Sequence, residues 1–426
     1  MVEIPLPNNR ASRHALRSMI RHRSVLAALE VFHAELGDVF GLPVPGFNPV
    51  VLVGPEANHF VLVEGRDDLR WRAEQDPITQ LLRHGVLVED GESHDHIRRA
   101  MNPALHKRML SSYTDWMRQC TDTVMKGWGD APLDMLVEMR KIALLILTKT
   151  LFNVDFEPEL KRLWGAILRT LRYISPGPWI IWSGIPRLGY QHALKALDDY
   201  LYQIIRLRRH TPGDDLLGLL IASGMPDALI RDQLPTILIA GHDTRAALLS
   251  WALYVLSSRP DIQDKARAEI DRTLGDNPPD YALVSQLHYL EQVINETLRL
   301  YPPIHLGSRI AARDLEFQGY PIPAGRRVLY SIYLTHRDPR YWRNPAEFMP
   351  ERFAPEQARP PYTFLPFGGG ARNCIGMAFA QVEAKVVLAR ILQRYVLEFT
   401  GHRVHLHMGA TLEPRPAVWV KVRRRS

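Results

Sequence analysis

Residues 366–376 read PFGGGARNCIG, in which Cys374 follows three glycines and an arginine. Glycines let the backbone approach a flat ligand closely and adopt conformations that other residues avoid. Backbone N–H groups at the start of a helix, together with its positive dipole end, stabilise a thiolate. The stretch therefore predicts an anionic sulfur presented to a flat metallocofactor, with Arg372 in reach of a carboxylate on the cofactor's edge.

The same stretch resembles the heme-binding signature of cytochromes P450, Phe-x-x-Gly-x-Arg-x-Cys-x-Gly, at every fixed position. The resemblance implies that Cys374 is the iron ligand of heme b and that Phe367, Gly368 and Arg372 contact the cofactor. The other cysteine of the chain, Cys120, has no comparable surroundings, and we interpret it as a small buried hydrophobe.

Two segments on the N-terminal side of the cysteine support the resemblance. Glu296 and Arg299 match the family's Glu-x-x-Arg, and the segment 348–353 resembles its downstream arginine motif. Residues one helical turn apart meet on one face of a helix. The resemblance implies that Glu296, Arg299 and Arg352 form a buried ion network that fixes the cysteine loop.

A long apolar segment, about residues 226–258, carries the sequence Ala-Gly-His-Asp-Thr-Arg from Ala240 to Arg245. A glycine followed by polar residues loosens a helix, because glycine is a poor helix former and threonine can bond back to carbonyls. By itself the segment is also consistent with a helix kink around a satisfied aspartate. It resembles the family's oxygen-binding groove, which implies that Ala240 and Gly241 line the oxygen side, Thr244 binds the oxygen or its water, and Asp243 relays protons.

Two residues depart from the family pattern in this segment. Arg245 stands where the family usually has Thr or Ser, and Pro235 lies early in the segment. Pairing of Arg245 with Asp243 would hold back the proton relay. Members of the family that use peroxide tend to lose the Asp-Thr pair, so its presence favours oxygen activation.

Cationic residues elsewhere match positions that reach the heme propionates in the family. His94 and Arg98 lie one turn apart in residues 90–99, and Arg309 follows the Glu-x-x-Arg segment. Each of them alone is equally consistent with a solvated surface. The resemblance assigns all three to cofactor binding.

The composition is that of an ordinary globular protein, with 46% hydrophobic and 23% charged residues. Two cysteines exclude a disulfide framework. Arginines interrupt the first thirty residues, and we find neither a signal peptide nor a membrane anchor, which favours a cytoplasmic protein. The net charge of +7 suggests an acidic partner, but no motif supports nucleic-acid binding.

Helical periodicity dominates the chain, and short strands are expected near residues 50–54, within 304–330 and at the C-terminus. We predict a mainly α protein with a minor β region, the cytochrome P450 fold, as one heme domain over residues 1–426 without a fused reductase. The predicted helices span about residues 93–107, 112–128, 134–152, 157–174, 190–208, 226–258, 262–274 and 285–300, and one more follows Cys374. The Trp-rich loop near 175–190 is a packed corner, a mobile lid over a pocket, or a surface that touches lipid.

The resemblance implies a monooxygenase that activates O₂ with two external electrons and inserts one oxygen atom into a hydrophobic small molecule. A terpenoid, carotenoid, steroid or fatty acid fits equally well as the substrate. Electrons are expected from an external ferredoxin or flavodoxin with its reductase, docked on basic residues near the cysteine, and the protein is expected to be a monomer. Two alternatives remain: a peroxide-dependent peroxygenase of the same fold, and a non-catalytic heme-binding protein.

Overall fold

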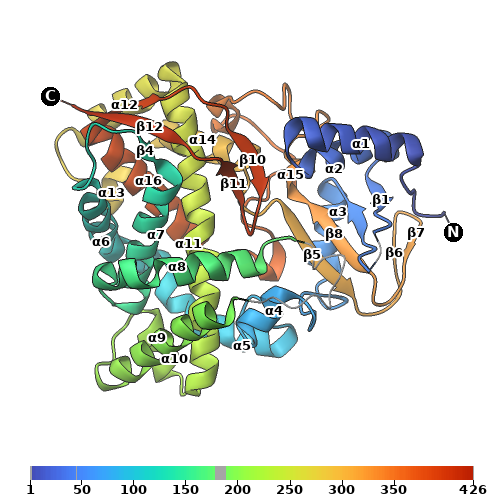
Figure 1. The fold of residues 1–426 in the computed structure, drawn as a ribbon, viewed down its shortest axis with the longest axis horizontal. Helices are drawn as coiled ribbons and strands as arrows, with labels where there is room; N and C mark the ends of the chain where they lie inside the picture. Colours follow the sequence, from blue (N-terminus) through green and yellow to red (C-terminus); the bar gives the residue numbers. More distant parts are fainter. Residues whose placement is uncertain (1, 45, 178–188, 426) are drawn as a thin grey trace.

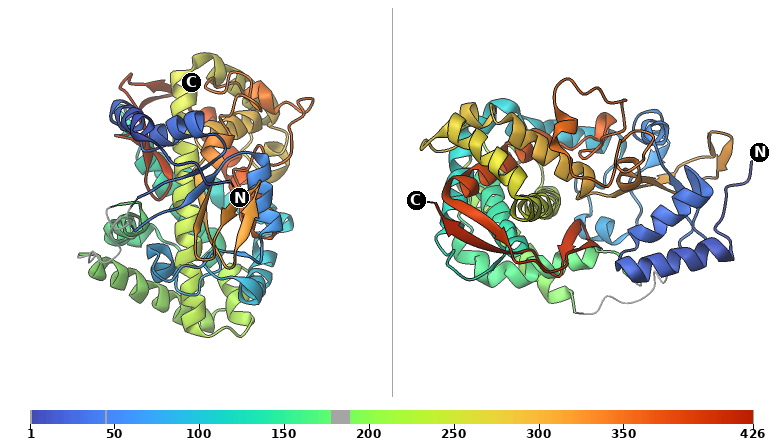
Figure 2. Two further views of the ribbon diagram at one scale, coloured as in Figure 1. Left: turned by 90° about the vertical axis from the view of Figure 1, so that its right-hand side faces the viewer. Right: turned by 90° about the horizontal axis from the view of Figure 1, so that it is seen from above.

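The computed structural model describes residues 2–44, 46–177 and 189–425. Most of the Trp-rich loop therefore lies outside the described residues. The two termini lie at opposite ends of the long axis of the molecule (Figure 1). Helices build most of the body, and a small sheet lies at the N-terminal end (Figures 1 and 2). The predicted mainly α fold with a minor β region is confirmed.

The helix α11 (Asp227–Ser258) runs through the middle of the molecule and is seen end-on in the right-hand view of Figure 2. It is buried on nearly all sides, as expected for a helix enclosed by others. It continues through Pro235, and it packs against α7, α9, α14 and α16. The longer helices around it are α5 (Gly91–Met101), α6 (Lys107–Met125), α7 (Met135–Phe152), α8 (Glu157–Ile174), α9 (Gln191–His210), α12 (Pro260–Leu274), α14 (His288–Leu300) and α16 (Met377–Arg394).

Local signals set several of these helix ends. The Asp134 carboxylate accepts the Leu136 N–H at the start of α7, and Asn153 takes a left-handed conformation at its end. The shorter helices are α1 (Asn9–His22), α2 (Leu26–Leu36), α3 (Pro55–His59), α4 (Pro77–Leu82), α10 (Leu216–Ala222), α13 (Tyr281–Val284) and α15 (Ile332–Thr335). Helices α1 and α2 were not among the predicted helices; in α1, the arginines spread around the helix hide its narrow buried face of Ala11 and Ala15.

A five-stranded sheet has the order β1-β2-β8-β5-β3. The strands are β1 (Val39–Gly41), β2 (Val50–Leu52), β3 (Leu69–Arg70), β5 (Leu306–Ala311) and β8 (Arg327–Ser331). Only the β2–β8 pair is parallel, with Val51 opposite Leu329. The remaining strands form small antiparallel groups: β4 (Leu133–Asp134), β6 (Leu315–Phe317), β7 (Tyr320–Ile322), β9 (Tyr395–Phe399), β10 (His405–Met408), β11 (Leu412–Arg415) and β12 (Trp419–Arg424).

One large apolar core joins the helices around α11, and two smaller clusters lie on the faces of the five-stranded sheet. The cysteine loop leads directly into α16, which is buried against α6, α11 and α12. This packing holds the loop beside the middle of α11. No described helix has the length and apolar character needed to cross a membrane.

Candidate functional site

The cysteine loop is folded back on itself before α16 begins at Met377. The Cys374 N–H donates to the Phe367 carbonyl at 2.8 Å, and Gly368 and Gly370 have positive φ angles of 68° and 64°. A Cβ atom at Gly370 would lie 2.2 Å from the carbonyl oxygen of Leu62. Glycine is therefore required there by both conformation and space.

The Cys374 thiol is accessible although protein surrounds it. Its side chain is exposed, yet burial is the largest influence on the thiol and raises its pKa. The backbone N–H of Gly376 and the charges of Arg98 and Arg245 act in the opposite direction. A thiol that is both accessible and surrounded by protein faces a surface inside the molecule, where few waters solvate a thiolate. A bound metal ion would deprotonate such a thiol outright.

A second accessible surface runs along one face of α11. Ile237, Ala240, Gly241 and Thr244 are accessible, while their neighbours Leu238, Ile239, His242, Asp243 and Arg245 are buried. The spacing of i, i+3, i+4 and i+7 places the four accessible residues on one face. The Thr244 hydroxyl donates to the Ala240 carbonyl at 2.6 Å. The charge of the adjacent Arg245 acts on Cys374, so this part of α11 lies near the thiol.

Asp243 points away from that face into a buried ion network. Its Oδ1 accepts from Arg140 Nε at 3.0 Å and Nη2 at 2.8 Å, and its Oδ2 accepts from the Thr411 hydroxyl at 2.7 Å. Arg140 also pairs with Glu413 at 2.5 Å. The carboxylate of Asp243 is thus held by Arg140 of α7 and by Thr411, which lies just before β11.

Arg245 does not pair with Asp243, so that expectation is wrong. Its guanidinium donates to the Glu383 carboxylate of α16 and to the Gly241 carbonyl, and it lies 5.0 Å from the ring centre of Phe379. Residues two apart on a helix do not face each other, which directs Arg245 and Asp243 to different neighbours. Burial raises the pKa of Glu383 to about 7, against the lowering effect of Arg245.

The predicted propionate-binding residues gather near the cysteine loop. Arg98 donates to the carbonyl oxygen and Oδ1 of Asn373 at 2.8 and 2.6 Å. The charges of Arg372 and Arg98 add to burial in lowering the pKa of His94. The charge of Arg309 similarly adds to burial in lowering the pKa of Arg372 to about 10. Mutual repulsion of this kind shows that these side chains lie close together.

Few carboxylates balance this cationic cluster. Arg372 pairs with Asp90 at 2.6 Å, and His94 contacts Asp95 at 2.9 Å. Arg309 is only 5% exposed, and the hydrogen bond found for it within the described ranges goes to the Ser308 carbonyl at 2.7 Å. A buried guanidinium without a carboxylate partner in this part of the chain is suited to an anionic group. The accessible thiol, the glycine loop and these cations together fit a flat, iron-containing cofactor that carries carboxylates.

The predicted ion network behind the loop is confirmed. Arg299 Nε lies 2.7 Å from Glu296 Oε2, and Arg352 Nε lies 3.3 Å from Glu296 Oε1. Glu296 and Arg299 are fully buried. Arg299 also donates to the His336 carbonyl at 2.9 Å, and His336 Nε2 accepts the Leu365 N–H at 2.9 Å. Burial lowers the pKa of His336 to about 3, so the ring stays neutral and links the network to the start of the cysteine loop.

Sequence reasoning missed Arg140, Thr411, Glu413 and Glu383. Arg140 and Glu383 are charged residues inside apolar helical segments, and this was the available signal. Nothing in the sequence around β11 indicates that Thr411 donates to Asp243 or that Glu413 pairs with Arg140. The partners come from segments far apart in the chain, which no local pattern connects.

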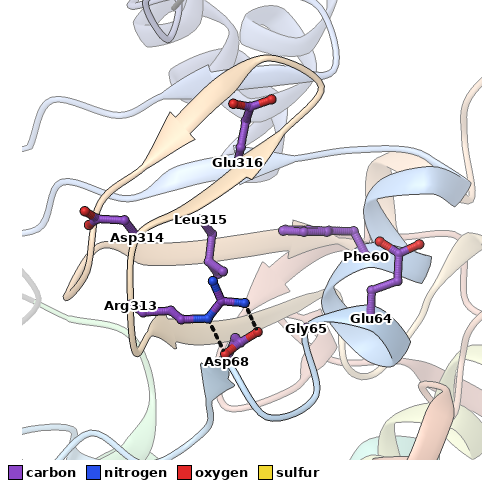
Figure 3. Close-up of a pocket in the computed structure, with 8 residues that line it drawn as sticks. All are labelled: Phe60, Glu64, Gly65, Asp68, Arg313, Asp314, Leu315 and Glu316. Carbon is purple, nitrogen blue, oxygen red and sulfur yellow. Dashed lines mark hydrogen bonds and ion pairs between the residues drawn. The ribbon is translucent and has the colours of Figure 1, made fainter.

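A separate pocket of about 510 Å³ lies at the edge of the small sheet and includes Phe60, Asp68, Arg313 and Glu316 (Figure 3). Arg313 is paired there with Asp68 at 2.7 Å, so its charge is already balanced. None of the predicted site residues lines this pocket, and it does not take part in the arrangement around Cys374.

Comparison with known proteins agrees with this geometry. Residues 14–418 match the family model described as Cytochrome P450. The chain is 32% identical to "Putative cytochrome P450 139" of Mycobacterium tuberculosis, over 93% of this chain and 97% of that protein. It is 30% identical to "Cyclooctatin synthase" of Streptomyces melanosporofaciens, over 95% and 90%. It is also 30% identical to "Cytochrome P450 97B2, chloroplastic" of Glycine max, over 95% and 84%.

Proposed function

Since this chain belongs to the cytochrome P450 family and is a heme-thiolate monooxygenase, we propose that its cofactor is heme b and that the Cys374 thiolate would hold the iron. The accessible thiol at the end of a glycine loop, close to Arg98 and Arg245, carries this proposal. Bound heme supplies the oxygen chemistry, and a thiolate ligand favours O–O cleavage. We further propose that residues 1–426 form one heme domain.

Around Cys374, one group of residues would contact the face of the cofactor and another group would bind the carboxylates at its edge. Phe367 and Gly368 would pack against the face, since the Phe367 carbonyl holds the Cys374 N–H and the loop is tight. The side chains of His94, Arg98, Arg309 and Arg372 would bind the cofactor's carboxylates. These side chains repel one another in the protein, and two carboxylates would relieve that repulsion.

Ala240, Gly241, Thr244 and Asp243 would serve the oxygen side. Ala240 and Gly241 carry no bulky side chain, which leaves room on that face of α11. The Thr244 hydroxyl can donate to the Ala240 carbonyl or turn to a neighbouring oxygen. Asp243 would deliver protons toward Thr244 after leaving Arg140 or Thr411, as a buried carboxylate does when its partners rearrange. Arg245 does not compete for Asp243, because it is bound to Glu383.

For the redox partner and the substrate, we propose only a chemical class. Exposed Arg99, Lys107 and Arg108 lie on α5 and α6, near the cysteine loop that Arg98 contacts. They suit an acidic ferredoxin or flavodoxin supplied by its reductase, with binding weakened by salt. The accessible side of α11 is apolar apart from Thr244, which suits a hydrophobic substrate such as a terpenoid, carotenoid, steroid or fatty acid. We propose that the protein acts as a monomer.

The test is the absorbance of the reduced carbon monoxide complex. The wild-type protein and Cys120→Ser should both show the long-wavelength band that thiolate-ligated heme gives. Cys374→Ser should lose that band and its oxygen-dependent turnover. Retention of the band by Cys374→Ser would refute the assignment of the ligand. Turnover with peroxide alone, and none with a reductase, would indicate the peroxygenase instead.

A further inference from the structure

A basic groove lies between the end of α1 and the β10–β11 hairpin. The groove has a volume of about 710 Å³ and is lined by Ile20, Arg21, Arg23, Arg403, His405 and Arg415, among others. No acidic residue lines it. In Figure 1, α1 lies at the surface close to β10.

The arginines of this groove are largely unbalanced. Arg415 pairs with Glu413 at 2.5 Å, whereas Arg21, Arg23 and Arg403 are exposed and have no carboxylate partner within the described ranges. Together with burial, the charges of Arg403 and Arg23 lower the pKa of His405. The two arginines, from different segments of the chain, therefore both place positive charge near His405. Such a groove favours an anion with several oxygen atoms, such as a phosphate.

The helix that borders the groove extends this basic surface. Residues 9–23 contain five arginines and no acidic residue. The inner face of α1 is Ala11 and Ala15, and the outer face carries Leu16 and Ile20, which are 51% and 68% exposed. Val25, just beyond α1, is 45% exposed. Exposed aliphatic side chains among arginines are typical of a helix that lies in a membrane interface.

The aliphatic residues distinguish between possible anionic partners. A soluble phosphate or a nucleic acid would use the arginines and leave Leu16 and Ile20 in water. A bilayer accepts both, because arginines meet the headgroup phosphates and aliphatic side chains enter the acyl boundary. We infer that α1 and the β10–β11 hairpin form a docking surface for an anionic phospholipid bilayer, with a headgroup phosphate in the groove.

This surface is peripheral, and it attaches the folded protein without a membrane-spanning segment. Several cations and a few aliphatic side chains give reversible attachment that depends on lipid charge and salt. The inference does not rest on the roles proposed for the heme-site residues, because none of the residues proposed to bind heme or to serve its oxygen side lines the groove.

The test uses the heme-loaded protein and vesicles of phosphatidylcholine, with or without phosphatidylglycerol, in a sedimentation assay. We expect binding to the anionic vesicles only, decreasing as salt rises. The variant Arg21→Gln/Arg23→Gln/Arg403→Gln should bind on the order of 100-fold more weakly, the factor expected for three cations at such a surface. The matched control, Arg99→Gln/Lys107→Gln/Arg108→Gln, removes the same charge elsewhere and should bind as the wild type does.

A second pair of variants tests the aliphatic contribution. Leu16→Ala/Ile20→Ala should weaken binding to anionic vesicles, and Leu207→Ala, at an exposed leucine of α9, should not. Equal loss of binding in the two triple variants would show that only net charge matters and would overturn the inference. Binding of inorganic phosphate or a single-stranded oligonucleotide, without binding to vesicles, would also overturn it. The absorbance of the heme establishes that each variant is folded.

Discussion

Arg245 is bound to Glu383 of α16, and Asp243, two residues earlier, is bound to Arg140 of α7. Two neighbouring charged residues of α11 therefore belong to separate ion networks on different sides of the helix. The separation matters because the Asp243 carboxylate keeps its own partners while Arg245 places a positive charge near Cys374. The unusual arginine is thus connected to the cysteine side and not to the proton-relay residue.

The raised pKa of Glu383 predicts a pH-dependent stability. The folded protein holds this proton up to about pH 7, whereas the unfolded chain releases it near the ordinary value of 4.5. The folded state binds the extra proton between these values, so the contribution of Glu383 to the free energy of unfolding is full below pH 4.5. It falls as the pH rises toward 7 and is constant above that.

Glu383→Gln removes this titration. In urea unfolding, the free energy of the variant relative to the wild type should increase between about pH 4.5 and 7 and then level off. Glu351→Gln, at an exposed residue paired with Lys265, should give a profile parallel to that of the wild type. A parallel profile for Glu383→Gln as well would contradict the assigned pKa.

Arg140 neutralises Asp243, and its loss should be costly. Arg140→Gln leaves the carboxylates of Asp243 and Glu413 buried without their shared cation, and we expect a loss of about 3–5 kcal/mol in the free energy of unfolding. Arg415→Gln removes the half-exposed cation at the edge of the same network and should cost below about 1 kcal/mol. Chemical denaturation measures both, and equal losses would show that Arg140 does not hold the network.

Arg299 should prove essential to the cysteine loop. Arg299→Leu leaves Glu296 buried without this cation and removes hydrogen bonds to the carbonyls of His336, Pro345 and Glu347. The expected loss is at least about 3–5 kcal/mol, with reduced heme content after purification. Arg259→Leu, which breaks the exposed pair with Asp261, should retain heme and lose about 0.5 kcal/mol. Full heme content in Arg299→Leu would show that the loop is held by other contacts.

The cationic cluster should determine heme affinity. We expect Arg309→Gln and Arg372→Gln to lower the affinity of the apoprotein for heme by roughly 10- to 100-fold each, the range for a charge-assisted hydrogen bond. The unfolding free energy of the apoprotein should rise or stay constant in Arg309→Gln, since a buried unpaired charge is removed. Titration with heme measures the affinity, and Arg313→Gln, in the exposed pair with Asp68, is the control. Unchanged affinity in both variants would remove them from the cofactor site.

The sequence by itself determined the features that depend on neighbouring residues. The cysteine loop, the Glu-x-x-Arg pair and the helix boundaries of α8 and α11 follow from spacings of a few residues, because helical periodicity and turn chemistry are local. Helix α1 was not predicted, because its buried face consists of two alanines among arginines. This buried face is too small to give a recognisable helical periodicity in the sequence.

The tertiary structure alone decided which charges meet. Arg140 lies 103 residues from Asp243, and Arg245 lies 138 residues from Glu383. The sequence pattern of a single helix does not predict such partners. They depend on how α7, α11 and α16 pack together and on the helix face from which each side chain projects. The same packing gathers His94, Arg98, Arg309 and Arg372 around one loop. A buried charge is destabilising unless an opposite charge lies beside it. The sequence alone does not show which residue supplies that opposite charge.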